Sequence, residues 1–154
     1  MTALIRKSSS LTTLTLFLAL ILLLIPGCKM NQKVSDKTLQ PADFAKVEEL
    51  LAMPEQRIVM LDVRRPDRFQ KEHIDGAFNI YMPQIRRRER LLTGDPIIIV
   101  YSSGEVRDYL STAACKRLLS LGYGSVYDYR GGLKDWLKQE GATTSTTVMA
   151  DLAE

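Results

Sequence analysis

The run Ile97-Ile98-Ile99-Val100-Tyr101 constrains the fold more than any other stretch of the sequence. Its branched apolar side chains do not alternate with polar ones, which is typical of a strand buried on both faces of a parallel sheet. The polar segment 102–107 follows directly and leads into a helical pattern. Because α/β proteins bind ligands at the carboxyl ends of their strands, we expect a functional loop there.

Strand and helix patterns alternate along the rest of the chain, whose 154 residues have room for one domain. Short apolar runs predict further strands at 57–63, 76–80 and 124–129. Apolar residues at helical spacing, in three cases after or at a proline, predict helices at 42–52, 65–72, 82–92, 106–121 and 133–139. This alternation predicts an α/β domain with a parallel sheet covered by helices on both faces.

The N-terminus has the pattern of a bacterial secretion signal. Arg6 and Lys7 precede the apolar run 11–25, which is short for a membrane span of about 20 residues. An uncleaved membrane anchor is the alternative interpretation. The sequence "LIPGC", which ends at Cys28, resembles the lipobox of bacterial lipoproteins, in which the cysteine is lipidated and becomes the new N-terminus. This resemblance implies a signal peptide over residues 1–27 and a lipid anchor on Cys28.

A lipidated chain would be attached to a bacterial membrane on its extracytoplasmic side, with the polar residues 28–40 as a tether. Lys29, rather than aspartate, after Cys28 favours the outer membrane, facing the periplasm, over the inner one in enteric-type bacteria. Removal of Arg6 and Lys7 lowers the formal charge from +3 to +1, so we expect no nucleic-acid partner. With Cys28 lipidated, Cys115 is left without a disulfide partner.

Several motifs along residues 41–141 are similar to those of the rhodanese family. Asp62-Val63-Arg64 at a predicted strand end matches the family pattern, as does His73-Ile74-Asp75-Gly76-Ala77 except for Asp75 in place of proline. The segment 121–136 resembles the motif near the C-terminal end of the family's domain. The matching residues are Leu121-Gly122-Tyr123, Val126, Gly131-Gly132 and Trp136. The likeness covers residues 41–141 and leaves 142–154 as a loose tail. It implies a single rhodanese-like domain with a parallel sheet of about five strands and helices on both faces.

The family's chemistry is sulfur transfer, by a cysteine that follows the fourth strand and carries sulfur as a persulfide. Counting from the strand end places that position at Ser102 and the arginine that often closes the loop at Arg107. A hydroxyl cannot carry transferable sulfur, and it is far less acidic than a thiol, whose reference pKa is about 8.5. The resemblance therefore implies that persulfide chemistry at Ser102 is lost. The span from Ser102 to Gly122 is longer than in common members, so either the loop is enlarged or the helix is extended.

Binding is the expected role of the residues at this edge of the sheet, and we expect no catalytic residue, cofactor or metal. The loop should surround an anion with its backbone N–H groups, as the family loop does. Its residues are Ser102, Ser103, Gly104, Glu105, Val106 and Arg107. Asp62, Arg64 and His73 should support the rim. The helix at 106–121 places an apolar stripe on one face, from Val106 to Leu121, with Cys115 partly buried on its flank.

The sequence thus predicts a membrane-anchored, noncatalytic rhodanese-like module that binds an anionic ligand or a protein partner outside the cytoplasm. The alternative is a sulfurtransferase that uses Cys115 or a partner's thiol. A serine hydrolase is disfavoured because the chain has one histidine, His73, and no nucleophile-elbow motif around Ser102. The basic run 85–90 is expected to be a solvated helix face.

Overall fold

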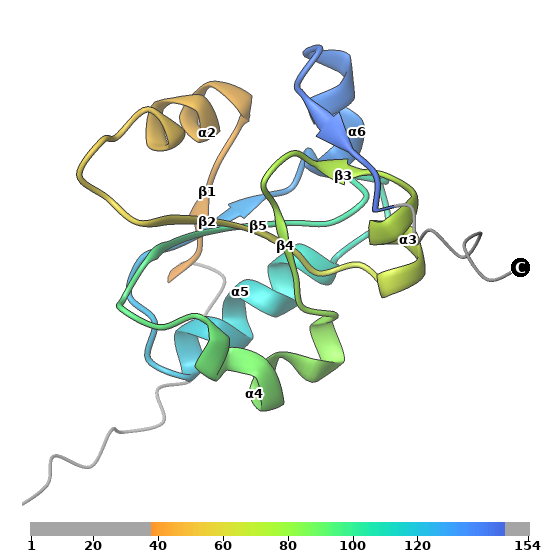
Figure 1. Ribbon diagram of the computed structural model, residues 1–154. Helices are drawn as coiled ribbons and strands as arrows, with labels where there is room; N and C mark the ends of the chain where they lie inside the picture. The colour runs from red at the N-terminus through yellow and green to blue at the C-terminus, as the bar shows by residue number, and fades with distance from the viewer. Residues whose placement is uncertain (1–37, 147–154) are drawn as a thin grey trace, which may run out of the picture. The chain divides into compact units, whose positions relative to one another are not determined.

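A five-stranded parallel sheet is the centre of the computed structural model, which describes residues 38–146 (Figure 1). Its strand order is β1-β6-β5-β2-β4, and every pairing in it is parallel. The strands are β1 (Gln40–Pro41), β2 (Ile58–Asp62), β4 (Phe78–Asn79), β5 (Ile97–Tyr101) and β6 (Val126–Tyr129). The predicted α/β fold class is confirmed. Cys28 and the predicted signal peptide lie outside the described residues.

The central strands end together because their registers align. Asp62 of β2 lies beside Tyr101 of β5, which lies beside Tyr129 of β6. Since all three strands run in the same direction, their carboxyl ends meet at one edge of the sheet. The candidate site is at this edge, as expected for an open parallel sheet.

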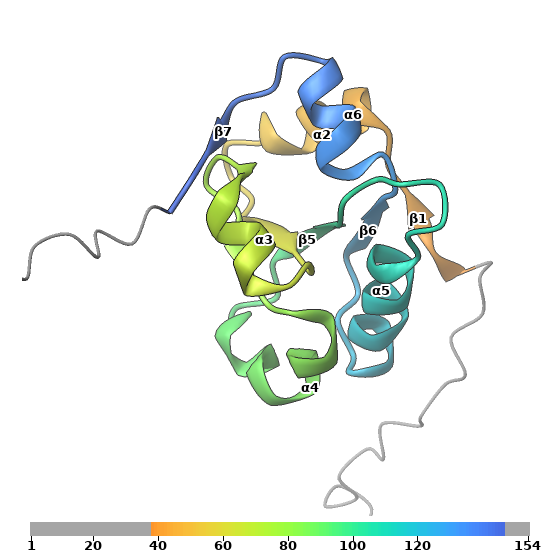
Figure 2. The ribbon, with the colours of Figure 1, turned by 90° about the vertical axis from the view of Figure 1, so that its right-hand side faces the viewer.

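Helices cover the sheet on both faces (Figures 1 and 2). One face carries α2 (Phe44–Leu51) and α6 (Gly132–Lys138), and the other carries α4 (Ile85–Arg88) and α5 (Leu110–Ser120). Successive side chains of β5 point to opposite faces of the sheet and pack in the two helical layers in turn. Ile98 and Val100 pack in the core beneath α5, whereas Ile99 and Tyr101 pack in the core beneath α2 and α6. Both faces of the strand are therefore apolar, which explains its continuous hydrophobic run.

The remaining helical segments are short. Helix α3 (Pro66–Lys71) begins at its proline, as predicted. The single helix predicted over 82–92 is instead divided into η2 (Met82–Gln84), α4 and η3 (Glu89–Leu91). Hydrogen bonds to the residue three positions back, such as Gln84 N–H to the Tyr81 carbonyl, interrupt the α-helical pattern. Among residues 38–146 no helix has the length and apolar content to cross a bilayer.

Both ends of the described chain are more ordered than the sequence suggested. Thr143–Thr144 forms strand β7, which pairs antiparallel with β3 (His73–Ile74), so the tail expected to be loose from residue 142 is held at its beginning. Trp136 Nε1 holds the residue before β7 in place by donating to the Ala142 carbonyl at 3.0 Å. At the other end, Leu39 packs against the core and Gln40 belongs to β1. The end of the predicted tether is therefore part of the sheet.

Helix α5 begins at Leu110, not at Val106 as predicted. The Asp108 N–H donates to the Glu105 carbonyl in a turn, and the Asp108 side chain accepts the Leu110 N–H, so the chain turns once before the helix starts. Val106 is 90% exposed and is not part of an apolar stripe. The buried face consists of Ser111, Thr112, Ala114, Cys115 and Leu118. Cys115 is therefore in the core rather than on the flank of the helix.

Two leucines of α5 allow this helix boundary to be tested with the same substitution. Leu118 is fully buried, whereas Leu110 is 37% exposed. We expect Leu118→Ala to lower the free energy of unfolding by about 2–5 kcal/mol, because it leaves a cavity, and Leu110→Ala to cost less than about 1 kcal/mol. Urea unfolding measures both. Equal losses would mean that Leu110 lies in the core and that the helix begins earlier.

Candidate functional site

The segment 102–109, here called the β5–α5 loop, connects the end of β5 to the start of α5 (Figure 2). Ser102 is buried at its base, Ser103 and Gly104 are half-buried, and the loop then turns outward through Glu105, Val106 and Arg107, which are exposed. The eight residues 102–109 separate the end of β5 at Tyr101 from the start of α5 at Leu110. Of the two alternatives that the sequence left open, this geometry fits an enlarged loop.

The Asp108 carboxylate lies inside this loop and accepts four hydrogen bonds. Its Oδ2 accepts from the Ser102 hydroxyl at 2.7 Å, from the Ser103 N–H at 3.0 Å and from the Ser103 hydroxyl. Its Oδ1 accepts from the Leu110 N–H at 3.0 Å. Burial alone would raise the pKa of Asp108, but the hydrogen bonds from Ser103, Leu110 and Ser102 hold that pKa below its usual value. The loop thus encloses an ionised carboxylate at neutral pH.

Sequence reasoning missed Asp108. An aspartate just before a helix is a common start signal, because its side chain accepts the first free N–H groups of the helix. That signal was available, but the apolar residue Val106 suggested an earlier helix start and placed Asp108 within the first turn. The expected anion-binding loop therefore contains a negatively charged side chain of its own, with which an external anion would compete.

The loop packs backbone to backbone against the start of α6. The Leu133 N–H donates to the Ser102 carbonyl at 3.0 Å, and the Lys134 N–H donates to the Ser103 carbonyl at 3.1 Å. A Cβ atom on Gly104 would lie 1.8 Å from the Gly131 carbonyl oxygen. One on Gly132 would lie 2.5 Å from the Ser102 carbonyl oxygen. The close approach therefore requires glycine on both sides, which gives the Gly131-Gly132 pair a structural role.

The rim is held by a buried ion pair. Asp62 is fully buried, and its carboxylate receives Arg64 Nη2 at 2.6 Å, Arg64 Nε at 3.0 Å and the Arg64 N–H at 2.8 Å. Arg64 Nη2 also donates to the Glu72 carbonyl at 2.7 Å. Asn79 Nδ2 ties the same turn by donating to the backbone carbonyls of Asp62 and Arg64. Asp62 and Arg64 therefore lie at the end of β2 and connect it to the segment after α3, a position that fits the expected support of the rim.

Tyr101 and His73 complete this support. The Arg64 guanidinium lies 5.9 Å above the Tyr101 ring centroid, and the Tyr101 hydroxyl accepts the Ile74 N–H at 3.2 Å. Burial, together with the charge of Asp62, raises the pKa of Tyr101, so its phenol stays neutral. His73 Nδ1 donates to the Phe69 carbonyl at 2.7 Å, and its ring stacks on Phe69. The Ser102 hydroxyl donates to Asp108, so its proton goes to a carboxylate and not to this histidine.

Cys115 lies in the core, apart from the loop residues that hold Asp108. It is 1% exposed, and its Sγ is 3.6 Å from the Tyr127 carbonyl oxygen. Burial, with the negative charge of Asp128 as a smaller cause, raises the pKa of the Cys115 thiol. Asp128 itself accepts the Thr112 hydroxyl at 2.7 Å and lies 3.5 Å from Arg130 Nε. A buried, neutral thiol is a poor nucleophile.

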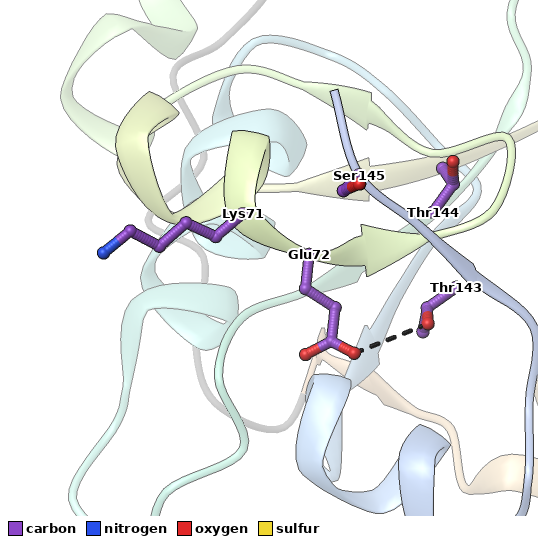
Figure 3. Close-up of a pocket in the computed structure, with 5 residues that line it drawn as sticks. All are labelled: Lys71, Glu72, Thr143, Thr144 and Ser145. Atoms are coloured by element: carbon purple, nitrogen blue, oxygen red, sulfur yellow. Dashed lines mark hydrogen bonds between the residues drawn. The ribbon is translucent and has the colours of Figure 1, made fainter. Parts of the chain in front are cut away.

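A surface hollow lies beside the two-stranded sheet, where α3, β3 and β7 meet (Figure 3). Its lining residues are Lys71, Glu72, Thr143, Thr144 and Ser145. Figure 3 shows the Glu72 carboxylate turned toward the Thr143 hydroxyl, 3.5 Å away, and the Lys71 side chain extending away from both. No residue of the β5–α5 loop lines it. Among residues 38–146, no group of three or more acidic, histidine or cysteine side chains is arranged to hold a metal ion.

Comparison with known proteins agrees with this architecture. Residues 46–139 match the rhodanese-like domain family. The chain is 30% identical over 128 residues to the uncharacterized protein YqhL of Bacillus subtilis, covering 83% of this chain and 93% of that protein. It is 34% identical over 84 residues to the thiosulfate sulfurtransferase PspE of Escherichia coli, covering 49% of this chain and 70% of that protein.

A solved structure is similar as well. The crystal structure of the Alr3790 protein from Anabaena sp. superposes with a TM-score of 0.60 at 27% identity, covering 68% of this chain and 80% of that chain. The chain therefore belongs to the rhodanese-like domain family, as the motifs around Asp62, His73 and Gly131-Gly132 indicated. Sulfurtransferases are among its relatives.

The close contact between the loop and α6 gives a direct test. Gly104 has φ +79° and faces the Gly131 carbonyl, whereas Gly124 has no atom within 4 Å of the site of a Cβ. We expect Gly104→Ala to lower the free energy of unfolding by at least about 1–3 kcal/mol, because the new methyl group meets backbone at a strained φ. Gly124→Ala should be neutral or slightly stabilising. Urea unfolding of both variants measures this, and equal effects would contradict the close packing.

Proposed function

We propose that this chain is a noncatalytic rhodanese-like module that binds a protein partner while anchored to a bacterial membrane outside the cytoplasm. The observation that carries the proposal is the hydrogen bond from the Ser102 hydroxyl to Asp108, at the position where the family resemblance implies a thiol. The proposal keeps the family fold and replaces the family chemistry by binding.

Neither Ser102 nor Cys115 has the surroundings of a sulfur carrier. Ser102 has no thiol, and its hydroxyl proton is directed to a carboxylate whose pKa is lowered, which makes that carboxylate a weak base. Cys115 has a thiol, but burial keeps it neutral and in the core. These two environments support a binding role.

Of the two ligand classes expected from the sequence, the geometry favours a protein partner over an anionic small molecule. An anion would compete with Asp108 for the Ser102, Ser103 and Leu110 donors. Protein interfaces are enriched in aromatic side chains and have apolar centres. Val106 and Tyr109 in the loop, and Leu110 at the start of α5, present apolar or aromatic side chains to solvent, with exposed fractions of 90%, 62% and 37%.

The membrane anchor rests on the sequence around Cys28. The basic start, the short apolar run and the small residue before the cysteine support a lipoprotein signal, and more than one acyl chain on the new N-terminus would give stable attachment. Lys29 favours the outer membrane, with the domain in the periplasm. The alternative function is sulfur transfer through Cys115 or a partner's thiol, and the thiosulfate sulfurtransferase PspE among the relatives favours it.

The two functions differ in thiocyanate formation from thiosulfate and cyanide. We expect the full chain, purified in detergent, and its Cys115→Ser variant to show no turnover above a protein-free blank, because neither carries a reactive thiol in the domain. The PspE protein serves as the positive control. Turnover that Cys115→Ser abolishes would establish the alternative, and turnover that survives it would contradict the assignment of Ser102 as inactive.

Lipid attachment can be tested separately from binding. We expect bacteria that express the chain to incorporate labelled palmitate into it, and Cys28→Ala to remove both the label and the membrane association. Cys115→Ala is the matched control and should retain both. Label that persists in Cys28→Ala would contradict anchoring at this cysteine.

A further inference from the structure

The β5–α5 loop contains a negative charge of its own, in the Asp108 carboxylate. We propose that Asp108 acts as a resident anion: it fills the loop and keeps it closed to anionic sulfur species such as thiosulfate or a persulfide. Replacing Ser102 by cysteine would then not be enough to create a reactive thiol. This proposal deepens the noncatalytic function proposed above, since it names a second residue, besides Ser102, that disables the loop.

The first support is the number of donors that Asp108 uses. A carboxylate can accept about four hydrogen bonds, and Asp108 receives four from within the chain. Two come from backbone N–H groups, at Ser103 and Leu110, and two come from the hydroxyls of Ser102 and Ser103. Backbone N–H groups of this kind are what a loop offers to a bound anion.

The second support comes from the two helices beside the loop. The start of a helix attracts anions because its first N–H groups have no partner within the helix. At α5 the Leu110 N–H is taken by Asp108 Oδ1. At α6 the Leu133 and Lys134 N–H groups are taken by the Ser102 and Ser103 carbonyls. These three donors are therefore used inside the domain.

The third support is electrostatic. Glu105 and Lys134, on the exposed side of the loop, pair with each other at 3.1 Å, so their charges compensate one another. Asp108 Oδ2, in contrast, lies 2.7 Å from the Ser102 hydroxyl oxygen. A thiolate or persulfide sulfur in place of that hydroxyl would meet a carboxylate at hydrogen-bond distance. A like charge this close disfavours the ionised thiol and raises its pKa.

The test introduces a thiol and then removes the carboxylate. The starting protein is the full chain with Cys28→Ala and Cys115→Ser, which eliminate both natural cysteines. Ser102→Cys is added, and the rate of alkylation by iodoacetamide is measured against pH. We expect a thiol pKa above the reference value of about 8.5. With Asp108→Asn added, the pKa should fall and the rate at pH 7 should rise about tenfold or more, as the thiolate fraction rises.

Glu105→Gln is the matched control, because it removes a negative charge from the exposed side of the loop without touching the hydrogen bonds of Asp108. We expect it to change the alkylation rate by less than about twofold, as an exposed charge is screened by solvent. A thiol pKa below about 8.5 with Ser102→Cys alone, or a rate at pH 7 that Asp108→Asn does not raise, would overturn the proposal.

A second measurement needs no substitution in the loop and applies even if these variants fold poorly. In the isotope-labelled natural sequence, the amide proton shifts of Ser103 and Leu110 should titrate together, with a midpoint below the usual aspartate value of about 3.9. Shifts that do not follow one common titration would overturn the proposal. Neither measurement depends on turnover. Thiocyanate formation by the natural chain would therefore contradict the proposed function, whereas the alkylation and amide titration results alone decide whether Asp108 is a resident anion.

Discussion

The buried ion pair of Asp62 and Arg64 holds the carboxyl edge of the sheet together. Arg64 links the end of β2 to the Glu72 carbonyl and to the Tyr101 ring, and Tyr101 in turn accepts the Ile74 N–H. Loss of either partner would leave an unpaired charge in the interior, at a cost of about 3–5 kcal/mol. Because the segment from α3 to β3 and the end of β5 both depend on this pair, so does the base of the β5–α5 loop.

On that base the loop is built from two kinds of contact. Glycines at 104 and 132 allow its backbone to lie directly against α6, and Asp108 satisfies the hydroxyls and N–H groups that point inward. Because these polar groups are hydrogen-bonded within the chain, they favour a single closed conformation of the loop. On the outside of the loop, Val106 and Tyr109 face solvent. The loop thus has a polar interior, and its exposed side carries apolar or aromatic side chains, Val106 and Tyr109, next to charged ones, Glu105 and Arg107.

The sequence predicted the elements that have a continuous apolar pattern. It failed where a single side chain determines the boundary of an element. Ile97–Tyr101 was found because a strand buried on both faces is apolar throughout, and Asp62 and His73 were found through a family motif. The start of α5 was misplaced because Val106 fits an apolar stripe, whereas the side chain of Asp108 sets the boundary. Strand β7 was missed because Thr143–Thr144 has no apolar pattern and forms only against β3.

The direction of the edge strand β1 determines where the described chain enters the domain relative to the β5–α5 loop. Since β1 runs parallel to β6, with Gln40 beside Tyr127 and Pro41 beside Asp128, the chain enters the sheet from its amino-terminal edge. The β5–α5 loop leaves from the opposite, carboxyl-terminal edge. The start of β1 and the β5–α5 loop therefore lie at opposite edges of the sheet, so the exposed side chains of the loop are carried away from the point where the described chain enters the domain.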